Sequence, residues 1–172
     1  MAKTMWVFVL AASLALIACT PQAKQSQAQT ETESTVSQGE ALLNILNANG
    51  QSLVVLNNDS LSYYNGRGVS DLLALLTDEP ERLKGAIVAD KMIGRAAAVL
   101  MTAGGVQAVY TNLISTPAVA VFREAGIPVS FREEVPQILN RDRSGQCPID
   151  ALLNEAEDVD ECVEILKNRF QQ

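Results

Sequence analysis

The chain has 172 residues, of which 48% are apolar, enough to fill the core of one ordinary domain with extensions. Its net charge is −7 and its 13 Lys and Arg residues are scattered, which argues against the clustered basic surface of a nucleic-acid-binding protein. The sequence has no histidine, which removes the most common general base, the most common zinc ligand and every nucleophile that pairs with histidine.

An export signal is indicated by the first 19 residues. Lys3 precedes an apolar run over residues 5–18, which is too short to span a membrane comfortably, and Cys19 follows the run. The end of this run, Leu16-Ile17-Ala18-Cys19, resembles a bacterial lipobox, in which the cysteine carries the lipid. The resemblance implies a lipoprotein signal peptide at residues 1–18, cleavage before Cys19 and attachment of acyl chains to Cys19. The alternative is an ordinary signal peptide, or an uncleaved anchor, with an incidental cysteine.

The expected location follows from this signal. Two or three acyl chains anchor a protein stably, so we expect a membrane of the cell envelope to be a partner of the exported chain. Thr20 stands where an aspartate often retains lipoproteins in the inner membrane, which favours the outer membrane, facing the periplasm, if the organism has one. Residues 19–38 are rich in Gln, Thr, Ser, Glu and Ala and have almost nothing to bury, so they are predicted to form a lipidated, disordered tether.

Residues 39–172 are expected to form a single domain. Its elements are predicted from apolar periodicity and from turn and cap residues. In chain order they are a helix over 39–47, strands over 52–56 and 60–64, a helix beginning at Ser70, a central helix over 89–100, a strand over 106–111, a helix over 116–126, a strand over 127–131, and helices beginning at Pro148 and Asp160.

Two of these predictions decide the fold class. Residues 89–100 form the most apolar stretch after the signal and are expected to run through the core as a helix, with Gly94 inside it and Gly104-Gly105 at its end. Residues 106–131 form a βαβ unit, whose strands pair in parallel. The element order therefore predicts an α/β fold, a three-layer α/β/α sandwich with a mixed sheet.

A polar loop near the C-terminus attracts functional interest. It contains Asn140, Arg141 and Asp142, and it ends at Cys147, directly before the helix that begins at Pro148. A helix N-terminus favours the thiolate of a cysteine, so Cys147 has the setting of a reactive thiol. Asn-Arg-Asp runs also make ordinary capped turns, and a cysteine is often a small buried apolar residue, so both readings stay open.

Several segments together resemble a known family. These segments are Ala89-Asp90-Lys91 with Gly94, Tyr110, Ser115-Thr116-Pro117-Ala118, Ala125-Gly126-Ile127-Pro128-Val129, Ile138-Leu139-Asn140-Arg141-Asp142, Gly145 and Cys147-Pro148. Through them the sequence is similar, over roughly residues 40–170, to the family catalogued as domain of unknown function 1893 (DUF1893). The resemblance implies a cytidine deaminase-like fold, and this chain departs from the family by its export signal and by Cys162.

Zinc chemistry is predicted to be absent despite this resemblance. Deaminases of that fold carry His/Cys-Ala-Glu on one helix and Pro-Cys-x-x-Cys at the start of another, which together hold the metal. The resemblance places Asp90-Lys91 and Pro117-Ala118-Val119-Ala120 at the corresponding positions, which offer one carboxylate and no thiolate or imidazole. No cofactor is therefore predicted.

A metal-free site is hypothesised instead, where the central helix meets the polar loop. Asp90 would act as a base or fix a ligand hydroxyl, Lys91 and Arg95 would hold an anionic group, and Cys147 would be a nucleophile or a packing residue. The remaining members of the hypothetical site are Asn140, Arg141 and Asp142. Helix capping and a solvated helix face explain Asp90 and Lys91 equally well.

Cys147 and Cys162 support a competing hypothesis. Disulfides persist in exported proteins, and a bridge between these residues would close a loop of about 15 residues and contribute about 3 kcal/mol. It would also remove Cys147 from thiolate chemistry.

The favoured function is a lipoprotein whose metal-free domain binds a small anionic or nucleotide-like ligand. One alternative is a non-metal enzyme that uses Cys147 or Asp90. Another is an envelope scaffold that contacts other proteins through an exposed apolar patch. Whether the chain is an enzyme, which ligand it binds and how it oligomerises are left open by the sequence.

Overall fold

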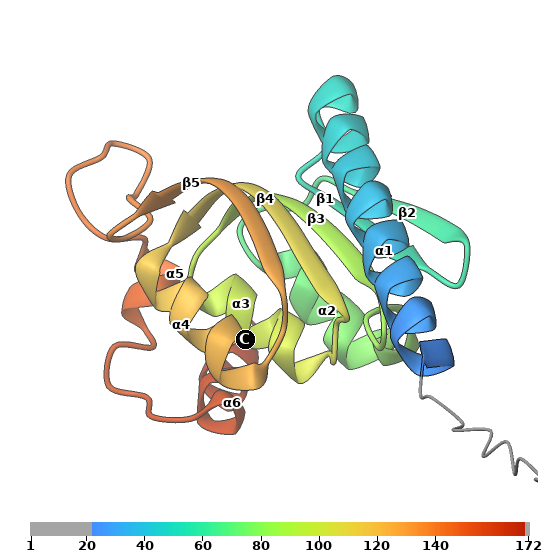
Figure 1. Ribbon diagram of the computed structural model, residues 1–172. Coiled ribbons are helices and arrows are strands. Elements are labelled where there is room, and N and C mark those ends of the chain that lie inside the picture. Colours follow the sequence, from blue (N-terminus) through green and yellow to red (C-terminus); the bar gives the residue numbers. More distant parts are fainter. Residues whose placement is uncertain (1–21, 171–172) are drawn as a thin grey trace, which may run out of the picture.

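A five-stranded mixed sheet forms the centre of the protein (Figure 1). A computed structural model describes residues 22–170, with side chains from Thr35 onward. The strand order is β2-β1-β3-β4-β5. Antiparallel pairs join β1 to β2 and β1 to β3, whereas β3, β4 and β5 run parallel. The strands are β1 (Leu53–Asn57), β2 (Ser60–Tyr64), β3 (Ile87–Ile93), β4 (Ala108–Ser115) and β5 (Val129–Val135).

Helices cover both faces of this sheet. One face packs against α1, which contacts β1, β3 and β4, and the other carries the larger core beneath α2, α3, α4 and α6 (Figure 1). The predicted α/β/α sandwich with a mixed sheet is therefore confirmed. The helices are α1 (Gln22–Asn49), α2 (Ser70–Asp78), a short 3₁₀ helix η1 (Pro80–Arg82), α3 (Arg95–Ala103), α4 (Thr116–Ala125), α5 (Pro148–Ala151) and α6 (Val159–Phe170).

The prediction of a central helix over residues 89–100 is wrong in its first half. Residues 87–93 form strand β3, and α3 begins only after Gly94. Val88 lies in the core beneath α3, whereas its neighbour Ala89 lies in the core beneath α1. A strand that is buried on both faces reads as a continuous apolar run, which resembles a buried helix in sequence. The correction adds a second parallel βαβ unit, β3-α3-β4.

The structure differs from the predicted disordered tether over residues 22–38, which belong to the long helix α1. Residues 22–38 contain no Gly or Pro, and Gln, Ala, Lys and Glu favour helices. The helix is fixed where it reaches the sheet: the hydroxyl of Tyr110 donates to the carbonyl of Thr35 at 3.1 Å. Gly39 permits this contact, since a Cβ there would lie 1.9 Å from the Tyr110 ring.

The signal sequence and Cys19 lie outside the described residues. Within residues 22–170, no helix combines the length and the apolar character needed to cross a membrane.

The other predicted elements are confirmed, with some shifted ends. The strands predicted over 106–111 and 127–131 continue to Ser115 and Val135. Polar residues obscured these ends, since β5 is an edge strand whose second half carries Arg132, Glu133 and Glu134. Charged side chains on an edge strand oppose pairing with other chains.

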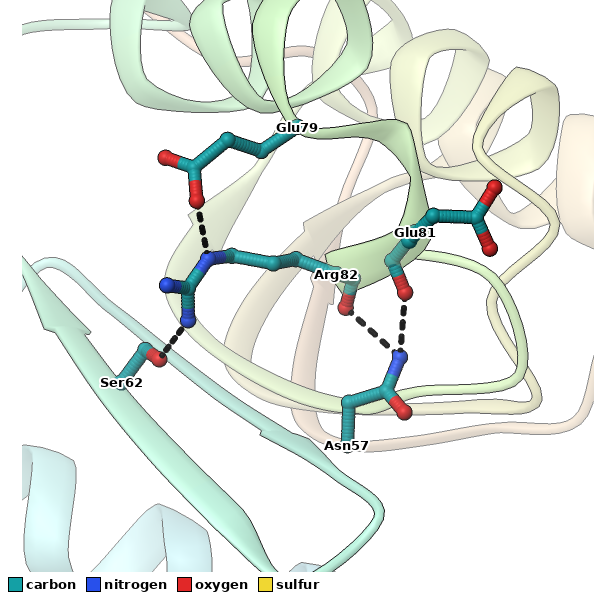
Figure 2. A network of polar contacts seen from close by, with 5 residues as sticks. All are labelled: Asn57, Ser62, Glu79, Glu81 and Arg82. Atoms are coloured by element: carbon teal, nitrogen blue, oxygen red, sulfur yellow. Dashed lines mark hydrogen bonds and ion pairs between the residues drawn. The ribbon is translucent and has the colours of Figure 1, made fainter.

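The β1–β2 hairpin is tied to η1 by a polar network (Figure 2). The Asn57 side-chain amide donates to the carbonyls of Glu81 at 2.8 Å, Lys84 at 3.0 Å and Arg82 at 3.1 Å. Arg82 pairs with Glu79 and donates to Ser62 Oγ at 2.9 Å. Since β1 runs antiparallel to β3, this network lies at the amino ends of the parallel strands. The network therefore stabilises the end of the sheet that lies opposite to the carboxyl ends of β3, β4 and β5.

Candidate functional site

An open cleft of about 630 Å³ lies toward the carboxyl ends of the parallel strands. In open α/β sheets, ligands bind outside the carboxyl ends of the strands, typically where the strand order reverses. The cleft combines one residue each from β3 and β4, two from β5 and the segment that follows β5. The lining residues are Met92, Leu113, Glu133, Val135, Pro136, Gln137, Ile138, Leu139, Asn140 and Arg143.

The floor of the cleft is apolar, and the polar side chains nearest to it on β3 and β4 bond to the backbone of their own strands. The Asp90 carboxylate accepts from the backbone N–H of Met92 at 2.9 Å. On β4, Thr111 Oγ1 donates to the carbonyl of Leu113 at 3.0 Å and accepts from its N–H at 3.3 Å. Each polar side chain thus bonds to the backbone two residues ahead on its own strand. Met92 remains 48% exposed and lies in the cleft beside Leu113.

The wall of the cleft is a self-bonded loop over residues 140–145. The Asn140 side chain donates to Ser144 Oγ at 3.0 Å and accepts from the N–H of Gly145 at 3.2 Å. Asp142 accepts from the hydroxyl of Ser144 at 2.8 Å and from its N–H at 3.2 Å, and these bonds lower the pKa of the Asp142 carboxyl. Asn140 and Asp142 therefore build the turn, as the capped-turn reading expected.

Arg143 occupies an unusual backbone conformation in this loop. Its φ is 60°, in the left-handed region that costs a non-glycine residue about 1–2 kcal/mol. Its side chain lines the cleft, whereas Arg141, two residues earlier, is exposed and does not line it. The loop thus holds a cation beside an apolar floor at a conformational cost, a combination that is often found at functional sites.

The residues of the hypothetical metal-free site do not meet in one place. Asp90 is half-buried in β3, and Lys91 is the next residue of the same strand, so their side chains point to opposite faces. Arg95 is occupied elsewhere: its guanidinium donates to the carbonyls of Leu153 and, at 2.8 Å, Ala156. Of the predicted residues, Asn140 lines the cleft.

Asp90 is nevertheless chemically distinctive. Burial raises the pKa of its carboxyl to about 7, and the negative charge of Asp71 adds to the rise, whereas backbone hydrogen bonds from Met92 and Lys91 oppose it. A carboxyl that titrates near neutral pH is suited to proton transfer. None of the described clefts is lined by Asp90.

The two described cysteines are free thiols, so the hypothesised disulfide is not present in the structure. Cys147 is half-buried and precedes α5, which is only four residues long. Cys162 is buried in the larger core, and this burial raises the pKa of its thiol. Cys147 thus lies half-buried before α5, whereas Cys162 lies inside the larger core.

A second, polar cleft of about 410 Å³ revealed a residue that the sequence had not singled out. Asp150, on α5, lines it and is only 6% exposed. Its carboxylate accepts from the N–H of Ala96 at 3.0 Å and thereby caps α3, while burial raises its pKa. Asp150 looked like an ordinary acidic residue in a first helical turn, and only the tertiary structure shows its partner 54 residues away.

No cluster of three or more Cys, Asp or Glu residues that could hold a metal ion is found among residues 35–170, whose side chains the structure describes. Arg143, Glu133 and Met92 are the other site residues that the sequence did not indicate. The polar run around Asn140 could have drawn attention to Arg143, but nothing in the sequence distinguishes Arg143 from Arg141.

Comparisons with known proteins give the following matches. The model of a family described as a domain of unknown function (DUF1893) matches residues 41–170. A DUF1893-family protein from Thermotoga maritima has a solved structure that matches with a TM-score of 0.70 and 27% identity, over 76% of this chain and 88% of that chain. No curated protein matches this chain.

A weaker structural match is RibD from Acinetobacter baumannii. Its TM-score is 0.36 and its identity 15%, over 63% of this chain and 36% of that chain. We draw nothing from a likeness of this size, so the cytidine deaminase-like part of the fold assignment stays a prediction.

Proposed function

This chain belongs to the DUF1893 family, and we propose that its domain binds a small anionic ligand, of the nucleotide-like kind, in the cleft between β3–β5 and the 140–145 loop. The observation that carries this proposal is a single cation, Arg143, beside an apolar floor in a cleft of about 630 Å³. Small-molecule sites are concave and mostly apolar, with a few polar groups that fix the ligand, and they commonly have about this volume.

The residues that line the cleft suggest a separate role for its apolar floor and for Arg143. The floor, with Met92 and Leu113, would bury the apolar body of the ligand. Arg143 would bind its anionic group, because a guanidinium can donate two parallel hydrogen bonds to a carboxylate or phosphate. No side-chain partner of Arg143 is found among the described residues, so its donors are available.

Substitution of Arg143 by Asn tests this proposal. Asn removes the charge but tolerates the left-handed conformation, so the loop should keep its shape. We expect the affinity for adenosine monophosphate, measured by isothermal titration calorimetry, to fall at least about tenfold, since hydrogen bonds to charged groups contribute about 1.5–3 kcal/mol.

Arg141→Asn is the matched control, because it makes the same change in the same loop outside the cleft. Its affinity for adenosine monophosphate should equal that of the natural chain within about twofold. An equal loss in both variants would mean that general charge attraction, rather than the cleft, holds the anion.

We also propose that the chain is a lipoprotein of the cell envelope, on the strength of the lipobox-like segment that ends at Cys19. In cells fed a clickable palmitate analogue, the natural chain should become labelled and sediment with membranes. Cys19→Ser should abolish labelling and release the exported chain, because the lipid anchor would be missing. Labelling that persists in the variant would rule out Cys19 as the acceptor.

An interaction role is the second candidate, and one observation favours it. Met92 and Leu139, both in the cleft, are 48% and 40% exposed, so the cleft presents apolar side chains that a partner protein could cover. Stable copurification with an envelope protein, lost on Leu139→Asp, would favour this role over ligand binding. An enzymatic role for Asp90 or Cys147 has less support, because neither residue lines a described cleft.

A further inference from the structure

The polar groups of the cleft differ in whether they are already used. Asn140 is fully engaged by Ser144 and Gly145 within the loop. Glu134, which neighbours the cleft on β5, is also engaged, since its carboxylate accepts from Thr116 Oγ1 at 2.7 Å. Glu133 and Arg143, in contrast, line the cleft and have no side-chain hydrogen bond in the described part of the chain. The available groups are therefore one carboxylate and one guanidinium.

These two opposite charges do not neutralise each other. Among residues 35–170, whose side chains are described, the ion pairs are Arg82–Glu79 and Lys167–Glu164, so the guanidinium of Arg143 stands more than 4 Å from the carboxylate of Glu133. Glu133 extends from the edge strand, in register with Leu113, whereas Arg143 belongs to the loop. The cleft therefore presents two unpaired, opposite charges together with its apolar lining.

We propose that the cleft selects a dipolar ligand, an apolar body that carries both an anionic group for Arg143 and an ammonium or N–H donor group for Glu133. A purely anionic ligand would leave its apolar part beside the unpaired Glu133 carboxylate, which carries an electrostatic and a desolvation cost. A ligand with both groups can pair with both Arg143 and Glu133. Zwitterionic aromatic amino acids and nucleotides with amino-bearing bases have this pattern. This inference rests on the proposed function, because it refines the ligand class of the same cleft.

Three indole compounds test the inference, since they share one apolar body and differ in charge. Tryptophan carries both groups, 3-indolepropionate only the anion, and tryptamine only the cation. Titrations would measure the affinity of the exported domain for each compound. We expect tryptophan to bind at least about tenfold more tightly than either of the others, because it alone forms both charged contacts.

Two variants assign the contacts. Glu133→Gln should lower the affinity for tryptophan and for tryptamine about tenfold, and the affinity for 3-indolepropionate should stay unchanged or rise slightly. Arg143→Asn should lower the affinity for tryptophan and for 3-indolepropionate and leave the affinity for tryptamine unchanged. Glu134→Gln is the matched control on β5, because this residue lies outside the cleft lining and glutamine can keep the bond from Thr116. It should change none of the three affinities.

The outcomes separate the two proposals. If 3-indolepropionate binds as tightly as tryptophan and Glu133→Gln has no effect, the cleft binds anions and the dipolar inference is wrong. If none of the three compounds binds at millimolar concentration and adenosine monophosphate does not bind either, the proposed function itself fails.

Discussion

Replacing Asp90 by Asn is expected to stabilise the domain by about 2–4 kcal/mol at pH 8. The carboxyl of Asp90 is half-buried and takes part in none of the ion pairs found among residues 35–170, and burial raises its pKa from 3.8 to about 7. Each unit of such a shift corresponds to 1.36 kcal/mol, and partial exposure reduces the full value. Asparagine removes the charge yet keeps an oxygen that can accept from the N–H of Met92.

The same shift predicts how the stability of the natural chain depends on pH. Between about pH 4 and pH 7 the folded state keeps the Asp90 proton, whereas the unfolded chain has lost it, so the free energy of unfolding falls as pH rises. The contribution of the protonated Asp90 carboxyl to the free energy of unfolding is lost once the pH exceeds about 7. Urea denaturation of both chains across this range would show the natural chain losing stability relative to Asp90→Asn.

Asp78→Asn is a suitable control, because it changes an exposed carboxylate at the end of α2. Its stability should run parallel to that of the natural chain at every pH. Parallel curves for Asp90→Asn as well would show that Asp90 is ionised in the folded protein throughout this range. Asp90 would then be well solvated, which contradicts the burial that raises its pKa.

The fold was predictable wherever local residues decide it. The β1–β2 hairpin follows from Asn58 and Asp59, which adopt the positive φ values of 46° and 64° that the turn requires. The helix α4 follows from Ser115, whose Oγ accepts from the N–H of Ala118, and from Gly126 at φ 69°. Both ends of this helix are marked in the sequence by residues that cap it.

Strand β3 was not predictable in this way, because its partners lie far away in the chain. It pairs with β1 and β4 inside the sheet, and both of its faces are covered, one by α1 and the other by α3, which removes the alternation by which a strand is recognised. The error carried over to the site. A helix over residues 89–100 would bring Lys91 and Arg95 to one face, whereas a strand followed by Gly94 and α3 separates them.

The cleft residues share a related limitation. Glu133 and Arg143 are ordinary charged residues in sequence, and they line the same cleft only because β5 pairs with β4 and the 140–145 loop folds back beside it. The self-bonded turn around Asn140 was one of two readings of the sequence. That this turn holds Arg143 in the left-handed conformation follows only from the backbone.

Gly94→Ala is expected to destabilise the domain by about 2–3 kcal/mol, and this cost should depend on Asp150. Gly94 is the N-cap of α3, with an ordinary φ of −92°, so alanine strains no backbone torsion there. A Cβ would lie 2.3 Å from the Asp150 carboxylate, which is held by the N–H of Ala96. The added methyl group therefore must displace the side chain that caps α3.

A double-mutant cycle with Asp150→Ala tests this explanation. Asp150→Ala alone should cost about 1–2 kcal/mol, because the N–H of Ala96 loses its acceptor in a buried setting. In that background the obstruction is gone, so Gly94→Ala should cost less than about 1 kcal/mol. Chemical denaturation of the four chains would then give a coupling energy of at least about 1 kcal/mol. Additive costs would mean that Gly94 is required for a reason other than the close approach of Asp150.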